Sequence, residues 1–157
     1  MAENKDVVIQ AGRDHYRAEV FAGGKRVVVD EPLEVGGKDA GPSPYDLLLG
    51  SIGACTAMTL RMYADRKGWP LESVVVRLRQ ARTYDKDCVE CVSSPVGPHQ
   101  VERELTLEGD LTEEQKARLV ELADRCPIKQ TLERGLHVVA APPSAGAAAT
   151  PVDAAVS

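Results

Sequence analysis

The four cysteines of this chain are the residues whose positions say most about chemistry. Cys126 stands directly before Pro127 in DRCPIKQTLERG, and Gly135 closes the same stretch. Proline favours the first turn of a helix and glycine the position past its end, so PIKQTLER is predicted to be a short helix with Cys126 at its N-cap. A thiolate there would face unpaired N–H groups and the positive end of the helix dipole, which lower a cysteine pKa. The pattern indicates a reactive thiol; the alternative is a small residue that merely fits the cap.

Cys55 lies on a stripe of a longer predicted helix. The stripe residues recur at spacings of four and three and are Leu48, Ile52, Cys55, Thr59 and Met62. Free cysteine packs as a small hydrophobe, so a place in the core is the simplest interpretation of Cys55 alone. Taken with Cys126, it could instead belong to a pair of attacking and resolving thiols. Sequence spacing does not say whether the two sulfur atoms lie close together.

The most visible motif is DCVEC, which contains Cys88 and Cys91. C-x-x-C is half of a structural zinc site, and His99 is the nearest further ligand in the sequence. The same spacing also serves redox proteins, where it normally opens a helix. Here Asp87 and Glu90 flank the cysteines, and negative charge raises thiol pKa values. A metal site, an auxiliary redox pair and a structural or unassigned pair are the three hypotheses.

The elements that must position these residues follow from periodicity and end signals. Ser43 and Gly68 bound the longest helical pattern, and its small residues let neighbouring backbone approach, so we expect a central, largely buried helix. Thr112 and Gln115 have capping-box spacing at the start of an amphipathic helix. Strands are predicted at 15–22, 26–32, 71–85, 101–109 and 136–140, and helices at 44–68, 111–125 and 127–134.

This order of elements predicts an α+β fold without regular βαβ units. The 157 residues suit one domain with a single core, which we expect over residues 1–140. Residues 141–157 form a low-complexity tail that is predicted to be disordered.

Composition narrows the function classes. The formal charge is 19 − 24 = −5 and aromatic residues make up 4%, so we expect no nucleic-acid partner. The N-terminus lacks the apolar core of a signal peptide, and the mostly apolar run from Leu47 to Leu60 is too short to span a bilayer. We therefore expect a cytoplasmic protein that needs no membrane and whose cysteines are reduced, catalytic or metal-binding. No Gly-rich phosphate loop is present, and no cofactor is predicted.

Two segments together resemble the family of osmotically inducible protein C and organic hydroperoxide resistance protein (OsmC/Ohr). They are GPSPYDLLLGSIGACTAMTLRMYADRKGWPLESV, with its S-P-x-x-L-L-x-x-x-x-x-A-C pattern, and ELADRCPIKQTL, with C-P at the start of a helix. The similarity covers roughly residues 15 to 140. It implies an intertwined α+β homodimer in which antiparallel sheets wrap around long central helices.

The resemblance also implies a chemistry. In family members with peroxidase activity the helix cysteine, here Cys55, attacks an organic hydroperoxide, or hydrogen peroxide less well, and becomes a sulfenic acid. The second cysteine, here Cys126, condenses with it to a disulfide, and a dithiol or lipoyl-type reductant resets the pair. An arginine of the N-terminal strand region assists, for which Arg17 matches better than Arg13. Where the family has a glutamate after the S-P pair, this chain has Tyr45.

The sequence thus predicts a cysteine peroxidase that uses Cys55, Cys126 and Arg17. Two alternatives are kept: an OsmC-like protein that binds a metal or a small ligand without peroxidase turnover, and thiol–disulfide exchange through Cys88 and Cys91. For the metal alternative the ligands would be Cys88, Cys91 and His99.

Overall fold

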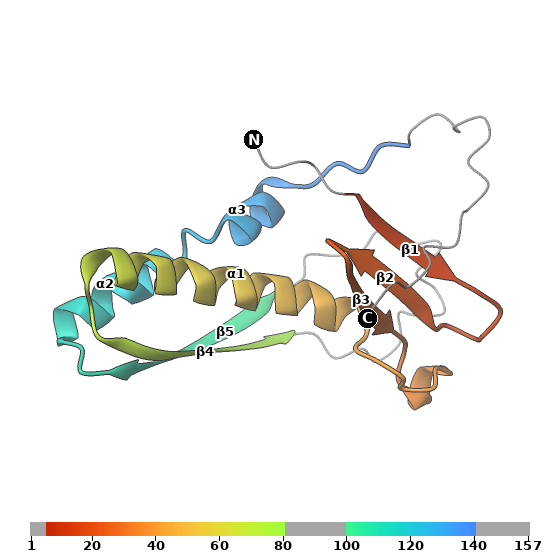
Figure 1. Ribbon diagram of the computed structural model, residues 1–157, viewed down its shortest axis with the longest axis horizontal. Coiled ribbons are helices and arrows are strands. Elements are labelled where there is room, and N and C mark those ends of the chain that lie inside the picture. The colour runs from red at the N-terminus through yellow and green to blue at the C-terminus, as the bar shows by residue number, and fades with distance from the viewer. Residues whose placement is uncertain (1–5, 81–99, 141–157) are drawn as a thin grey trace.

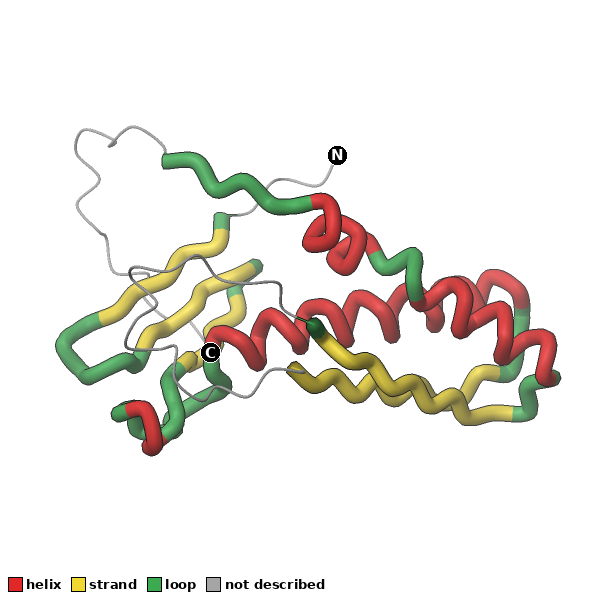
Figure 2. The backbone as a smooth tube through the Cα atoms, turned by 180° about the vertical axis from the view of Figure 1, so that it is seen from behind, coloured by secondary structure: helices red, strands yellow, loops and turns green. Residues whose placement is uncertain are grey.

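The computed structural model describes residues 6–80 and 100–140 of the chain. These residues form two small antiparallel sheets and three α-helices, which confirms the predicted α+β class (Figures 1 and 2). In chain order the elements are β1 (Val7–Ala11), β2 (Ala18–Ala22), β3 (Lys25–Val29), the short 3-10 helix η1 (Leu33–Val35), α1 (Pro44–Lys67), β4 (Leu71–Gln80), β5 (Val101–Gly109), α2 (Glu113–Ala123) and α3 (Pro127–Arg134).

The two sheets lie at different places along α1. β1, β2 and β3 form an antiparallel meander at the N-terminal end of the helix, whereas the hairpin of β4 and β5 runs along one side of it (Figure 1). Side chains alternate along β4: Val76 and Leu78 face α1, while Arg77 and Arg79 point away and form ion pairs with Glu104.

The ends of α1 are fixed by the predicted signals. Ser43 Oγ accepts from the Asp46 N–H at 3.2 Å, and the Asp46 carboxylate accepts from the Ser43 N–H at 2.9 Å, which together make a capping box. Gly68 ends the helix with a left-handed φ of 64°, which glycine adopts without steric cost. The Asp46 carboxylate is thus engaged at the start of the helix.

The buried face of α1 differs from the predicted stripe. Ile52, Thr56, Leu60 and Ala64 are buried, while Leu48 and Met62 are 39% and 62% exposed. Thr56 can be buried because its hydroxyl donates to the Ile52 carbonyl at 2.8 Å, so the side chain carries no unpaired donor. The expectation of a largely buried helix is therefore wrong for the single chain. By length and composition alone α1 could cross a membrane, but it packs on β4, α2 and α3 within the domain.

The core lies around the C-terminal half of α1. Its members come from α1, α2, the start of β4 and the turn before α2, and they are Leu60, Ala64, Leu71, Leu111, Leu119, Leu122 and Ala123. Trp69 packs edge-on against Tyr63 beside this cluster, with ring centroids 5.3 Å apart. This core packs α2 against α1. It therefore fixes the point at which the chain leaves α2 and continues to Cys126.

Two arginines anchor the helices to the hairpin. Arg61 of α1 donates to the carbonyls of Leu71 and Glu72 at the start of β4. Arg103 of β5 donates to the Ala123 carbonyl at 2.8 Å and to the Asp124 carboxylate at 2.9 Å. Because Arg103 satisfies a carbonyl at the end of α2, it holds the chain two residues before the cysteine.

A buried carboxylate shapes the loop that leads into α1. Asp30 is 1% exposed and accepts from the backbone N–H groups of Glu31, Lys38 and Ala40 at 2.8, 3.1 and 3.2 Å. Gly37 sits so close to this turn that a Cβ there would lie 1.8 Å from the Glu31 carbonyl oxygen. Asp30 therefore organises the Gly- and Pro-rich loop that the sequence indicated.

The bounds of the remaining elements agree only in part with the predicted ranges. The helix at 127–134 and the strand at 101–109 have the predicted bounds, and 111–125 shortens to α2. Two predictions are wrong: β1 was not foreseen, and residues 136–140 form no strand, because no neighbouring strand pairs with them in the described chain. Residues 81–85 of the predicted fourth strand, residues 1–5 and the tail at 141–157 lie outside the described residues.

Candidate functional site

Cys126 stands at the N-cap of α3, where the Pro127–Gly135 frame predicted it. Its side chain is fully buried, although α3 itself contributes no buried residue. In its protonated form Cys126 Sγ donates to the Ile52 carbonyl of α1, with 3.8 Å between the sulfur and the oxygen. The cap position and this contact hold the sulfur between α3 and α1.

The sulfur of Cys55 lies beside that of Cys126. Both cysteines are free, and each thiol alters the pKa of the other, so the two are neighbours across the contact between α1 and α3. Cys55 is partly exposed, whereas Cys126 is enclosed. The structure therefore brings together two of the three predicted catalytic residues, one of which can be reached from outside.

The surroundings of Cys55 favour its protonated form. Burial raises the pKa of the Cys55 thiol, and the hydrogen bond to Cys126 raises that pKa further. The Ile128 N–H and the Thr59 hydroxyl act in the opposite direction, because each can donate to the sulfur. The net effect raises the pKa of Cys55, so the protonated form is favoured over the thiolate.

The surroundings of Cys126 favour its thiolate. Burial raises the pKa of the Cys126 thiol, but four donors outweigh it, and the pKa is lowered. These donors are the Cys55 thiol, the Lys129 N–H, the Thr56 hydroxyl and the Ile128 N–H. Ile128 and Lys129 occupy the second and third positions of α3, whose N–H groups have no partner within the helix. Cys126 thus occupies the predicted cap position and its pKa is lowered as expected, although its side chain makes no capping hydrogen bond to α3.

This arrangement can perform two-electron thiol chemistry. The two thiols are near enough to alter each other's pKa, so they are positioned to form a disulfide. One sulfur is enclosed and the other is partly exposed, as a resolving and an attacking thiol require. Because the pKa of Cys126 is lowered, its thiolate is the group that can act as a base for its neighbour.

Arg17 lies outside this pair. It precedes β2 and forms an ion pair with Glu19 at 2.9 Å, and Glu19 also binds Arg26. Arg26, together with Arg17, lowers the pKa of the Glu19 carboxyl. A catalytic role for Arg17 stays a prediction. Arg13 lies in the same loop before β2.

The other predicted ligands cannot be placed. Cys88, Cys91 and His99 lie outside the described residues. Within residues 6–80 and 100–140, no three His, Cys, Asp or Glu side chains gather in a way that could hold a metal ion. The metal hypothesis for DCVEC and the exchange hypothesis for its two cysteines stay predictions.

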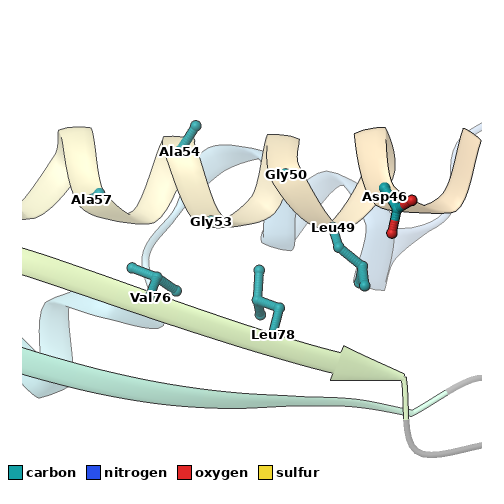
Figure 3. A pocket seen from close by; sticks show the side chains of 8 residues that line it. All are labelled: Asp46, Leu49, Gly50, Gly53, Ala54, Ala57, Val76 and Leu78. Carbon is teal, nitrogen blue, oxygen red and sulfur yellow. The ribbon is translucent and has the colours of Figure 1, made fainter. Parts of the chain in front are cut away.

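A cavity of about 420 Å³ lies between α1 and β4 (Figure 3). Small residues of α1 leave the space, among them Gly50, Gly53 and Ala57, and Val76 and Leu78 form its other wall. A Cβ on Gly53 would lie 3.1 Å from the Leu78 side chain, so the glycine permits this close approach of strand and helix. Neither Cys55 nor Cys126 lines the cavity. The close packing of α1 on β4 therefore explains the small residues of the motif, and they are assigned no role at the two sulfur atoms.

Sequence reasoning missed the polar groups that surround the sulfurs. Thr56 and Thr59 are one and four positions after Cys55, and residues four apart share a helix face. That spacing was available in the sequence for Thr59. For Thr56 and the Ile52 carbonyl no sequence signal existed, because their contact with Cys126 depends on how α3 packs on α1.

Comparison with known proteins places this geometry in context. The profile of a family described as OsmC-like protein matches residues 36–140, which include both cysteines. No curated protein has a significantly similar sequence.

Solved structures share the fold at low identity. An OsmC-like protein from Mycoplasma pneumoniae is 16% identical, with a TM-score of 0.66 over 85% of this chain and 89% of that one. An organic hydroperoxide resistance protein from Legionella pneumophila is 20% identical, with a TM-score of 0.56 over 83% and 89%. The organic hydroperoxide resistance protein OhrB of Bacillus subtilis is 17% identical, with a TM-score of 0.52 over 83% and 90%. At these identities the likeness establishes the fold.

Proposed function

Because this chain belongs to the OsmC-like protein family, we propose that it is a thiol-dependent peroxidase that reduces organic hydroperoxides through Cys55 and Cys126. The observation that carries the proposal is the proximity of the two free thiols, which alter each other's pKa where Cys126 packs against α1. Several proteins of the same fold are named organic hydroperoxide resistance proteins, which supports this substrate class.

In the first step Cys55 attacks the distal peroxide oxygen. Its proton passes to the Cys126 thiolate, a sulfur–oxygen bond forms and the oxygen–oxygen bond breaks. Cys55 is oxidised to a sulfenic acid, and the substrate is reduced to an alkoxide that takes a proton to become an alcohol. The proton stays on Cys126 Sγ, and the Ile52 carbonyl, 3.8 Å away, accepts a hydrogen bond from the resulting thiol.

In the second step the pair closes. Cys126 attacks the Cys55 sulfur, a disulfide forms and the sulfur–oxygen bond breaks. The hydroxide that leaves takes the Cys126 proton and departs as water. A dithiol or lipoyl-type reductant then returns two electrons and two protons to the pair. One hydroperoxide and one dithiol are consumed for each alcohol and water formed.

The setting of Cys55 favours an organic peroxide over hydrogen peroxide. Exposed apolar side chains stand near Cys55 along the chain or across the helix contact: Met58, three residues later in α1, is 64% exposed, and Ile128, whose N–H lowers the pKa of Cys55, is 38% exposed. An alkyl or aryl group would lose contact with water against these side chains, and hydrogen peroxide has no such group. These side chains therefore add binding for the larger substrate.

We include a homodimer in the proposal. The stripe of α1 that contains Cys55 leaves Leu48 and Met62 uncovered, Met58 of the same helix is also exposed, and Val138 and Val139 after α3 are 90% and 83% exposed. Exposed apolar side chains in such number favour an interface. A second copy would cover them, and that cover would also desolvate the mouth of the thiol site.

Arg17 completes the proposed machinery. A guanidinium near Cys55 would favour its thiolate and oppose the effect of burial. For this, Arg17 must leave its ion pair with Glu19 and bind the Cys55 sulfur instead. The ion pair is only partly shielded from water, since the side chains of Arg17 and Glu19 are 35% and 25% exposed. Such exposed pairs are weak, so the exchange is energetically accessible.

Hydroperoxide consumption tests the proposal. Purified protein with a dithiol and cumene hydroperoxide is expected to consume the peroxide catalytically, and Cys55→Ser should lower the rate by at least roughly a thousandfold. Cys88→Ser is the matched control, because it removes a thiol of the other pair. Activity that survives Cys55→Ser but is lost in Cys88→Ser would favour exchange through Cys88 and Cys91 instead.

A further inference from the structure

Two threonines of α1 place their hydroxyl groups beside the two sulfur atoms, one hydroxyl to each sulfur. Thr59 Oγ1 donates to the Cys55 carbonyl at 2.7 Å and also lies within hydrogen-bond reach of the Cys55 thiol. Thr56 Oγ1 donates to the Ile52 carbonyl at 2.8 Å and lies within reach of the Cys126 sulfur. The peroxidase steps above use neither hydroxyl.

Helix geometry explains why Thr59 reaches Cys55. Residues four apart lie on one face of a helix, and every Cα–Cβ bond tilts toward the helix N-terminus. The side chain of Thr59 therefore leans over the turn that carries Cys55. Both residues are partly exposed, so the hydroxyl stands beside the sulfur at the side from which a substrate can approach.

We propose that Thr59 is a further catalytic residue: its hydroxyl turns from the Cys55 carbonyl to the Cys55 sulfur when that sulfur becomes anionic, and it stabilises the attacking thiolate. This inference rests on the proposed function for its role in turnover, but the contact with the sulfur does not. No covalent bond of Thr59 forms or breaks, and its proton stays on the oxygen throughout.

The turn of the hydroxyl costs little and gains more. The Cys55 carbonyl lies inside α1 and keeps the N–H of Thr59 as its helical partner, so losing the hydroxyl leaves no acceptor unpaired. A hydroxyl has one proton to donate, and a bond to a charged acceptor is roughly twice as strong as one to a neutral carbonyl. The proton therefore follows the negative charge.

Two groups that face Cys55 oppose the effect of burial. From α3 the Ile128 N–H lowers the pKa of Cys55 more than the Thr59 hydroxyl does, whereas Cys126 raises that pKa. The Lys129 ammonium of the same helix is paired with Glu133 at 2.8 Å and with Asp124 at 3.8 Å. Thr59 is therefore the side chain close to Cys55 that opposes the effect of burial.

Site-resolved alkylation tests the inference without any peroxide. In a Cys126→Ser background, in which the neighbouring thiol is absent, the rate of iodoacetamide addition at Cys55 is measured by mass spectrometry from pH 5 to pH 10. Thr59→Val keeps the side-chain volume and removes the hydroxyl. We expect it to move the rise of the profile to higher pH and to slow alkylation roughly tenfold at pH 7, as loss of one charge-assisted hydrogen bond requires.

Three variants separate this role from a structural one. Thr59→Ser restores the hydroxyl and should restore the profile, whereas Thr59→Ala removes it in a residue that α1 tolerates well and should behave like Thr59→Val. Thr131→Val is the matched control, because Thr131 donates to the Pro127 carbonyl at 3.0 Å in the same way but sits on the exposed side of α3. Its profile should overlay the parent.

The inference is overturned if Thr59→Val and Thr59→Ala leave the Cys55 profile unchanged, or if Thr59→Ser fails to restore it. Its failure can be told apart from failure of the proposed function. Shifted profiles in a chain that consumes no hydroperoxide would support the hydroxyl contact and reject the peroxidase, while unshifted profiles in an active enzyme would reject only the role of Thr59.

Discussion

The thiols of Cys55 and Cys126 are neighbours between α1 and α3, and each shifts the pKa of the other in the opposite direction. The accessible sulfur keeps its proton because burial and Cys126 raise its pKa, whereas backbone N–H groups of α3 lower the pKa of the enclosed one. The pair thus separates two tasks, since one sulfur can meet a substrate and the other can accept a proton.

The first prediction concerns which sulfur is oxidised. In Cys126→Ser, one equivalent of cumene hydroperoxide should leave a sulfenic acid on Cys55 that dimedone traps, because no partner remains to close the disulfide. In Cys55→Ser the same treatment should give little adduct on Cys126, which is fully buried. Peptide mass spectrometry reads both. Equal trapping at Cys126 would assign the attack to the buried sulfur.

Much of this site follows from sequence signals that act locally. The proline and glycine around 127–134 determine α3 and put Cys126 at its cap, because their backbone preferences need no tertiary partner. The stripe through Cys55 was predicted as buried, but the buried face is shifted by one residue to Thr56 and Leu60. A threonine that bonds its own helix can take a core position, and binary patterning counts it as polar.

Contacts between distant segments were beyond the sequence. The approach of Cys126 to Ile52 depends on where α2 ends and how Arg103 holds that end, and neither leaves a periodic pattern. The prediction that Cys55 and Cys126 act together came from a family resemblance. β1 was not predicted because all five of its residues are exposed in the single chain. Its residue types therefore show no alternation between a buried and an exposed face, which is the pattern that identifies a strand.

The second prediction tests the anchor of the resolving cysteine. Arg103→Ala should destabilise the fold by about 2 kcal/mol, because it removes two hydrogen bonds of a charged, mostly buried side chain. It should also slow disulfide closure, since the segment before Cys126 loses its tether. Urea unfolding and quenched-flow thiol counting measure the two effects. Arg77→Ala is the control on β4, where a 60% exposed ion pair should contribute about 0.5 kcal/mol or less.

The third prediction is a pH dependence of stability. The pKa of the Asp30 carboxyl is lowered, because N–H groups of Glu31, Ala40 and Lys38 outweigh its burial. A carboxyl with a depressed folded-state pKa stabilises the fold above its unfolded-state value and loses that contribution as pH falls. Wild type should therefore exceed Asp30→Asn in stability above about pH 5, and the gap should shrink below about pH 4.

Urea unfolding of both proteins from pH 7 to pH 3 measures this gap. Asp14, Glu19 and Glu121 also have lowered pKa values, but they are present in both proteins and cancel in the difference. A gap that stays constant with pH would mean that Asp30 acts by shape and not by charge.

The fourth prediction addresses the homodimer. Met62 is 62% exposed on the stripe, so Met62→Glu should leave the stability of a monomer nearly unchanged but bury an unpaired charge in the proposed interface. We expect the dimer dissociation constant to rise by at least roughly a hundredfold in light-scattering chromatography. Val120→Glu, at a 51% exposed position of α2, is the control and should leave the dimer intact. If the parent protein and Met62→Glu both elute as dimers, the interface does not include Met62.

Disulfide mapping after a single turnover tests the central claim most directly. Reduced protein receives one equivalent of cumene hydroperoxide, remaining thiols are alkylated in acid, and the disulfide-linked peptides are identified by mass spectrometry. The account predicts a link between Cys55 and Cys126, formed in proportion to peroxide and absent without it. A Cys88–Cys91 link with Cys55 and Cys126 still reduced would contradict it.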